Sequence, residues 1–177
     1  MDDRALVNAL RAGDAHAPRL MIERFQTIVF SLCLRMMSHR QDAEDVMQES
    51  FVRALRGLPG FNPERSFRPW LLGIAANRCR TALAKRVRRP GLSDSVEDQV
   101  DHRPGLNDPD DIAGEIERAL GRLRPEYRLV FTLFHEQSLG YEEIAEAVKR
   151  PIGTVKTWLH RARAELAEDL SRRGVRC

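Results

Sequence analysis

One internal segment, residues 89–111, restricts the possible folds of this chain more than any other feature. Its sequence, RPGLSDSVEDQVDHRPGLNDPDD, is rich in Pro, Gly, Ser and Asp and has no apolar period, whereas helical periodicity recurs on both sides of it. Strand signals are nearly absent. We therefore predict an all-α fold of two small helical domains, residues 1–89 and 112–177, joined by a flexible acidic linker over residues 90–111.

The periodic segments on either side of this linker predict eight helices. Apolar residues recur three and four positions apart within each, and Pro, Gly and capping residues mark several of the ends. The expected ranges are residues 3–12, 15–37, 40–58, 67–88, 112–120, 125–136, 141–148 and 153–172.

The composition is that of a soluble, folded protein, because 42% of the 177 residues are hydrophobic and 31% are charged. The formal net charge is only +3, so the arrangement of the charges says more than their total. Residues 78–89 hold six cations and no carboxylate, whereas acids dominate residues 94–117. Basic blocks on both sides of an acidic middle indicate two surfaces for a polyanion such as nucleic acid.

Several classes of protein are excluded by what the sequence lacks. The start, MDDRALVNALRAGD, has acids where a secretory signal needs cations, and no run approaches the length of a membrane span, so we expect a cytoplasmic protein. Cys33, Cys79 and Cys177 are odd in number and far apart, which argues against a disulfide framework and a zinc site. We predict no catalytic residue, metal or cofactor, because phosphate-cradling glycine loops and nucleophile elbows are also absent.

A helix-turn-helix is predicted within residues 139–166, LGYEEIAEAVKRPIGTVKTWLHRARAEL. Ile144 and Val148 form the inner side of its first helix, and Ala145 is small enough to let the second helix cross closely. Pro151 prevents the first helix from continuing, and Gly153 with the following Thr allows a second one to start. Spacing, helix breaker and cap therefore agree.

The second helix of this unit has two different faces. Its apolar stripe consists of Val155, Leu159, Ala162 and Leu166. The opposite face carries residue types suited to phosphates and base edges in a major groove, namely Lys156, Thr157, His160 and Arg161. The alternative is a solvated basic face, and we favour the groove because the turn chemistry and the polar face coincide.

The segment 42–55, DAEDVMQESFVRAL, predicts a helix with an unusual outer side. Its core side consists of Ala43, Val46, Met47, Ser50 and Ala54. The outer side mixes the polar Asp45, Gln48 and Glu49 with Val52 and Leu55, as does a helix that docks on a basic partner helix. Equally, Val52 and Leu55 could pack against another helix of the same domain.

The segment 67–89, FRPWLLGIAANRCRTALAKRVRR, begins with two aromatic residues and ends in the cation block. Aromatic rings beside cations suit single-stranded nucleic acid, because bases stack on the rings and the backbone follows the positive charge. Trp70 has core packing as its alternative role. Asn77 offers both a donor and an acceptor to a base edge.

These motifs together resemble the extracytoplasmic-function (ECF) group of bacterial RNA polymerase sigma factors over nearly the whole chain. The matching motifs are GDAHAPRLMIERF, DAEDVMQESFVRA, FRPWLLGIAANRCRTAL and LRPEYRLVFTLFHEQSLGYEEIAEAVKRPIGTVKTWLHRARAEL. Four motifs in order around a linker of the expected length make the resemblance specific. It implies a sigma region 2-like bundle at residues 1–89 and a sigma region 4-like helix-turn-helix domain at residues 112–177.

The resemblance also implies a role for each surface. The helix at 42–55 would bind the coiled coil of the polymerase largest subunit through Asp45, Gln48, Glu49 and Leu55. The segment 61–86 would capture and open the −10 element and hold a flipped base, through Phe67, Trp70, Asn77, Arg78, Arg80, Thr81, Lys85 and Arg86. The helix after Gly153 would read the −35 element through Lys156, Thr157, His160 and Arg161. An anti-sigma factor that covers both domains is a further implied partner.

Three departures from the family pattern limit this transfer. Lys149 replaces the small or turn-favouring residue between the two helices, and a residue other than Gly in a left-handed turn costs about 1 kcal/mol. Thr157 and Trp158 stand where Ser and a basic or polar residue are common, so the −35 sequence does not follow. Thr81 and Ala82 take places often held by Asp and an aromatic residue, so the −10 preference does not follow either.

We therefore predict a promoter-specificity subunit that is monomeric when free. It would join core RNA polymerase, position it at two spaced promoter elements, melt the DNA and be released, with no covalent chemistry of its own. The competing prediction is a helix-turn-helix regulator that binds a palindromic duplex without polymerase, which leaves the cations at 78–89 unexplained. An enzyme is the weakest alternative.

Overall fold

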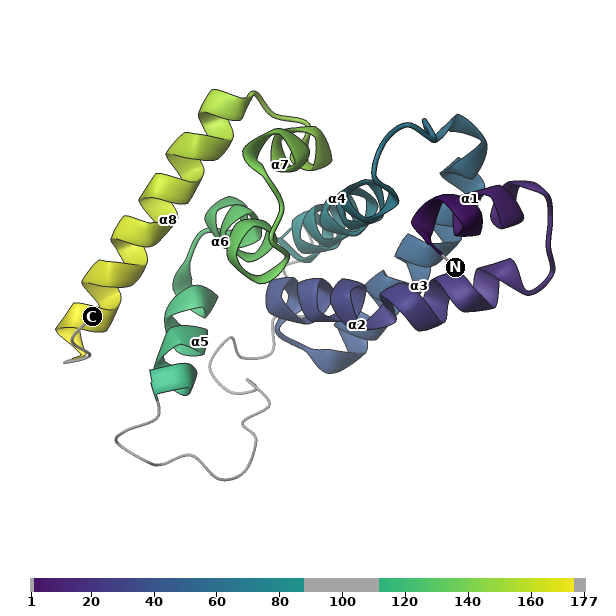
Figure 1. Ribbon diagram of the computed structural model, residues 1–177. Helices are drawn as coiled ribbons and strands as arrows, with labels where there is room; N and C mark the ends of the chain where they lie inside the picture. The colour runs from purple at the N-terminus through teal and green to yellow at the C-terminus, as the bar shows by residue number, and fades with distance from the viewer. Residues whose placement is uncertain (1, 88–111, 174–177) are drawn as a thin grey trace.

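The computed structural model describes residues 2–87 and 112–173 (Figure 1). Within these residues the fold is all-α, as predicted. The long helices are α1 (Asp3–Arg11), α2 (Ala17–Met37), α3 (Arg40–Gly57), α4 (Phe67–Val87), α5 (Ile112–Arg122), α6 (Pro125–Phe131), α7 (Tyr141–Val148) and α8 (Ile152–Arg172). The predicted linker, residues 90–111, lies outside the described residues.

Two short irregular turns were not predicted. A 3₁₀ turn, η1 (Leu58–Gly60), follows α3. The single helix expected at 125–136 is wrong, because α6 stops at Phe131 and continues as a π-helical turn, η2 (Thr132–Glu136). There the amide of Gln137 donates to the carbonyl of Thr132, five residues back, at 3.0 Å. A π-helical turn has one more residue between the bonded groups than an α-helical turn, so the side chains after it point in a different direction around the helix axis.

The N-terminal half is a bundle of α2, α3 and α4, with α1 packed against α2, α4 and η1. The buried face of α2 repeats at helical spacing and fills the centre of the bundle with Met21, Phe25, Val29, Leu32 and Met36. The predicted core side of α3 is buried as expected, with Met47 only partly covered. The core is therefore that of an ordinary amphipathic bundle.

The C-terminal half contains the predicted helix-turn-helix in α7 and α8. Gly140 precedes α7, and its amide donates to the Glu143 carboxylate at 2.8 Å, which satisfies one free N–H of the helix start. At the other end Lys149 adopts the left-handed conformation, with φ 54° and ψ 51°, and its amide bonds back to α7. Pro151 then precedes α8, so the predicted turn is confirmed.

Lys149→Gly should raise the free energy of unfolding by roughly 0.5–1 kcal/mol. A β-carbon in the left-handed region costs about 1 kcal/mol, and glycine removes that cost while adding some backbone entropy to the unfolded chain. Urea unfolding of the full chain, followed by circular dichroism, measures the change. Lys149→Ala keeps the β-carbon and serves as the control. If Lys149→Gly were no more stable than Lys149→Ala, the backbone at position 149 would not be strained.

The two halves also pack against each other, which the sequence did not predict. Helix α4 of the first half lies along α7 of the second, and α2 contacts α6 and η2 (Figure 1). One continuous group of buried apolar side chains crosses the boundary, with Leu32 and Leu71 on one side and Leu133 and Ile144 on the other. A smaller second group joins α5, α6 and the outer part of α8.

Candidate nucleic-acid interface

Helix α8 presents the polar face that the sequence predicted. Lys156, Thr157, His160 and Arg161 are all exposed, whereas Val155, Leu159, Ala162 and Leu166 are buried. Trp158 is partly buried and packs against both apolar groups. The exposed face therefore stays free for a ligand while the opposite face anchors the helix.

Local contacts orient the side chains on this face. The Lys156 ammonium lies 5.5 Å from the centre of the Tyr141 ring, a cation–π distance. The Thr157 hydroxyl donates to the carbonyl of Gly153 at 2.9 Å. Arg161 donates to the hydroxyl of Tyr127 at 3.2 Å. The cations are thus held along one side of α8 by aromatic residues of neighbouring helices.

His135, in η2, contacts Arg163 of α8, and no motif in the sequence pointed to this contact. Partial burial and the nearby Arg163 charge lower the pKa of His135. Its neutral ring accepts a hydrogen bond from Nε of Arg163 at 3.2 Å. The Arg163 guanidinium also lies 5.2 Å from the centre of the Phe134 ring. Arg163 therefore links α8 to η2 in this structure.

The cations of α4 do not form the single strand-facing block expected from the sequence. Arg78 is only 12% exposed and pairs with Glu49 of α3. Arg80 donates to the carbonyl of Val148 at 3.2 Å, and Arg86 pairs with Asp42 at 3.2 Å. Lys85 is exposed. Because successive side chains point in different directions around a helix, these cations face α3, α7 or solvent rather than one common side.

Two polar residues lie among these cations. Asn77 is half-buried on α4, and its carbonyl accepts a hydrogen bond from the hydroxyl of the exposed Thr81 at 2.9 Å. This bond between residues four apart occupies the Thr81 hydrogen but leaves the Asn77 side-chain amide unused by it. The amide of Asn77 therefore keeps the donor and acceptor that a base edge needs.

The aromatic residues before the cations form a cluster that corrects the expectation for Phe67. Its ring is only 1% exposed and lies 5.4 Å from the Phe25 ring and 5.6 Å from the Phe61 ring, between centres. A ring enclosed in this way offers no free face for stacking on a base. Trp70 is half-buried, with its ring 4.8 Å from Phe61, so it packs on the core and keeps part of its surface.

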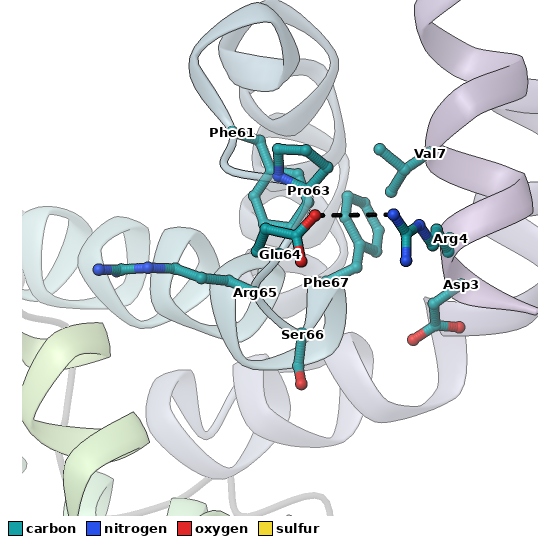
Figure 2. A pocket seen from close by; sticks show the side chains of 9 residues that line it. All are labelled: Asp3, Arg4, Val7, Phe61, Pro63, Glu64, Arg65, Ser66 and Phe67. Atoms are coloured by element: carbon teal, nitrogen blue, oxygen red, sulfur yellow. Dashed lines mark ion pairs between the residues drawn. The ribbon is translucent and has the colours of Figure 1, made fainter.

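A cavity of about 240 Å³ opens beside this cluster, and the sequence had indicated only the loop that forms one side of it. Figure 2 shows its aromatic wall, Phe61 and Phe67, and the ion pair of Arg4 with Glu64, 3.6 Å apart, across its rim. Arg65 points away from it. Helix α1 also lines this cavity, through Asp3, Arg4 and Val7. The sequence did not indicate this role, because charged residues are common at the exposed start of any helix.

Helix α3 carries the acidic and apolar outer face noted in the sequence. Asp45 and Gln48 are exposed, and Val52 is 45% exposed, so it does not pack within the domain. Leu55 is partly buried against the core, as the alternative had it. Desolvation alone would raise the pKa of Glu49, but hydrogen bonds from Arg78 and Arg53 outweigh it and hold that pKa below its ordinary value. Glu49 thus links the α3 face to α4.

The described residues were compared with the usual ligand sets of metal ions. Among residues 2–87 and 112–173, His, Cys, Asp and Glu side chains form no group of three or more that suits a metal ion. Cys33 and Cys79 are buried free thiols with sulfur atoms 3.9 Å apart, and their contact and burial raise the pKa of Cys33. In the same residues, no helix has both the length and the apolar character needed to cross a membrane.

Comparisons with known proteins identify the family to which the chain belongs. Family models of sigma-70 region 2 and of sigma-70 region 4 match residues 21–89 and residues 113–166. The ECF RNA polymerase sigma-E factor of Haemophilus influenzae is 33% identical over 181 residues, covering 96% of this chain and 95% of that protein. The RNA polymerase sigma-H factor of Pseudomonas aeruginosa is 31% identical over 180 residues, covering 95% and 93%.

Two solved structures share the fold. CnrH, in complex with the cytosolic domain of CnrY, matches with a TM-score of 0.69 at 24% identity, over 96% of this chain and 97% of the matched chain. The sigma factor RpoE, in complex with the anti-sigma factor NepR from Bartonella quintana, matches with a TM-score of 0.70 at 23% identity, over 86% and 96%.

A helix-turn-helix with an exposed basic recognition face, joined to a second cation-bearing helical unit, defines a DNA-binding protein. The two matching family models and the similarity over nearly the full chain then give its family. The chain belongs to the ECF group of the sigma-70 family of RNA polymerase sigma factors.

Proposed function

We propose that this protein is the promoter-specificity subunit of a bacterial RNA polymerase, which directs the core enzyme to −35 and −10 elements and helps to open the DNA. One observation carries the proposal: a single chain holds an exposed basic face on α8 and, on a separate helix, the exposed cations Lys85 and Arg86 of α4, which begins beside a cavity at Phe61 and Phe67. The first suits a duplex groove, and the second suits an unstacked strand.

Helix α8 reads the −35 element in the major groove. The second helix of a helix-turn-helix enters that groove and contacts base edges with side chains of its N-terminal part. Lys156, Thr157, His160 and Arg161 occupy the first three turns of α8 and are exposed together. Arg and Lys bind guanine edges, while Thr and His add smaller polar contacts.

Helix α4 and the loop before it hold the −10 element as a single strand. The cavity beside Phe61 and Phe67 carries the charged Arg4 and Glu64 at its rim, which suits the polar edge of an unstacked base, although neither buried ring offers a face for stacking. Its volume of about 240 Å³ is below the roughly 300–1,000 Å³ of sites for drug-sized ligands, as expected for a single base. Asn77, Thr81 and Lys85 continue the strand path along α4.

The outer face of α3 binds core polymerase. Asp45 and Gln48 surround the exposed Val52, and a mixed acidic and apolar stripe fits a basic partner helix such as one strand of a coiled coil. Leu55 lies half-buried at the end of this stripe and packs against the core of the domain. In this proposal, residues 1–89 form the polymerase and −10 domain, and residues 112–177 form the −35 domain.

An anti-sigma factor controls the protein in this proposal. The matched RpoE structure contains the anti-sigma factor NepR, and the matched CnrH structure contains the cytosolic domain of CnrY. The exposed apolar residues Leu20, Ile22 and Val52 of the present chain are available to such a partner. The expected partner is a protein that covers the α3 face and thereby prevents polymerase binding.

Transcription from fragmented genomic DNA tests the proposed function. Purified sigma-free core polymerase is incubated with and without the protein, and the 5′ ends of the transcripts are mapped. We expect new start sites that share two spaced upstream motifs. An absence of new start sites, together with tight binding of a palindromic duplex by the protein alone, would instead support the helix-turn-helix regulator.

A further inference from the structure

Arg161, on the polar face of α8, is held by a directed contact from a neighbouring helix. Its Nη1 donates a hydrogen bond to the hydroxyl of Tyr127, in α6, at 3.2 Å. The contacts of two other residues on this face are different, because Lys156 lies against a ring and Thr157 bonds within its own helix. Helix α6 packs against α8 (Figure 1), so the bond ties the polar face of α8 to its support.

Tyr127 is a rigid partner for this bond. Its side chain is only 5% exposed and belongs to the apolar group that joins α5, α6 and α8, together with Leu123 and Leu166. The Arg124 guanidinium also lies 6.0 Å from the centre of its ring. A phenol has only two side-chain torsions, so burial of the ring fixes the position of the hydroxyl oxygen. The long, flexible stem of Arg161 lacks such a restriction of its own.

The bond to Tyr127 leaves Arg161 able to read a base. A guanidinium has five N–H donors in one plane, and this contact uses one of them. Two others can bind O6 and N7 of a guanine, which is the commonest specific contact in the major groove. Arg161 is exposed, so DNA can reach the remaining donors.

A carboxylate of α8 can compete for the same guanidinium. Glu165 is exposed and lies four residues after Arg161, on the same side of the helix. The hydrogen bond to Tyr127 raises the pKa of Arg161, and the charge of Glu165 adds a smaller effect in the same direction. Without the hydroxyl, Arg161 would turn toward Glu165, which lies beyond the N-terminal part of the helix that enters a groove.

We propose that Tyr127 is a positioning residue for −35 recognition, whose hydroxyl holds the Arg161 guanidinium toward the groove so that Arg161 discriminates one base pair of the element. This inference rests on the proposed function of α8. Tyr127 acts through Arg161 and does not itself touch a base in this role. Arg161 favours a guanine at the base pair concerned, because its planar donors match O6 and N7.

Tyr127→Phe tests this role, because it removes the hydroxyl and retains the buried ring. Holoenzyme is assembled from core polymerase and the full chain, and initiation is measured on a promoter mapped with the wild type and on derivatives with each −35 base pair changed in turn. We expect Tyr127→Phe to initiate about fivefold more slowly on the unaltered promoter, the effect of one lost hydrogen bond. Its discrimination should fall only at the base pair where Arg161→Ala also loses discrimination. A purely structural role would weaken recognition of all the base pairs alike.

A double variant and a rescue show whether Tyr127 acts through Arg161. In the Arg161→Ala background, Tyr127→Phe should cause no further loss, because the two residues share one interaction. Glu165→Gln should restore part of the initiation rate of Tyr127→Phe, since it removes the competing carboxylate. Glu168→Gln is the matched control, because it removes another exposed carboxylate of α8, one that pairs with Arg172, and should restore nothing. Thermal melting checks that every variant is folded.

The outcomes separate this inference from the proposed function. The positioning role would be overturned, with the proposed function left standing, if the losses of Tyr127→Phe and Arg161→Ala multiplied in the double variant. Wild-type discrimination by Tyr127→Phe at the Arg161 base pair would lead to the same conclusion. If Arg161→Ala itself kept wild-type discrimination at every −35 base pair, recognition of the element by Arg161 would be overturned together with its positioning by Tyr127.

Discussion

Phe67→Ala should lower the free energy of unfolding by about 3–5 kcal/mol, the usual cost of removing a buried phenyl ring. The ring is 1% exposed and contacts Phe25, Phe61 and Trp70, so its loss leaves a cavity in the centre of the aromatic cluster. Because Phe61 and Phe67 also line the cavity beside α1, the variant should change the shape of that cavity as well. Urea unfolding of the full chain, followed by circular dichroism, measures this change.

Phe67→Leu is the control that separates a core role from a DNA-stacking role. Leucine retains most of the apolar volume and removes the aromatic face, so a core residue should tolerate it with a smaller loss of stability and with transcription largely preserved. The core assignment would be wrong if Phe67→Ala kept its wild-type stability while both variants lost promoter opening.

Lys156→Ala/Arg161→Ala should reduce transcription from the promoters of this protein by about 100-fold. A good contact between a side chain and a base edge contributes about 1–3 kcal/mol, so each single variant should lose about tenfold or more. Both side chains are exposed on α8, where Lys156 contacts Tyr141 and Arg161 contacts Tyr127 at the surface, so the fold should survive. Quantified run-off transcripts from start sites mapped with the wild type give the measurement.

Arg172→Ala is the matched control for that double variant. It removes another exposed cation of α8, one that pairs with Glu168 beyond the helix-turn-helix, and should leave transcription near the wild-type level. Thermal melting of all variants shows that they are folded. A folded double variant that transcribes like the wild type would exclude the α8 face from −35 recognition.

The helices and the turn of the helix-turn-helix were predictable because their causes are local. Apolar spacing placed seven of the eight α-helices in the described residues to within a few residues, α6 being the exception, and Pro151 with Gly153 located the turn. The π-helical turn η2 was missed, since the sequence TLFHE is compatible with a regular helix and the irregularity belongs to its packing. Local propensity predicts that a segment is helical, but it does not predict how packing against other helices changes the hydrogen bonding of that segment.

The candidate site divides in the same way. The exposed face of α8 follows directly from helical periodicity, and the structure places its four residues as expected. The cations of α4 were expected as one block, yet Arg78 turns to Glu49 and Arg80 to Val148. Phe67 was expected to face DNA and is enclosed. Sequence spacing gives the direction of a side chain around its own helix but not the partner that meets it.

By itself, the sequence determined the all-α class, the positions of the helices and the basic face of α8, because each depends on residues within a few turns of one another. Only the tertiary structure decided that α1 completes the cavity beside Phe61, and that Gly73 brings α4 against Ala147 of α7. These contacts join residues far apart in the chain. Their geometry depends on how whole helices pack, which no local pattern of residues records.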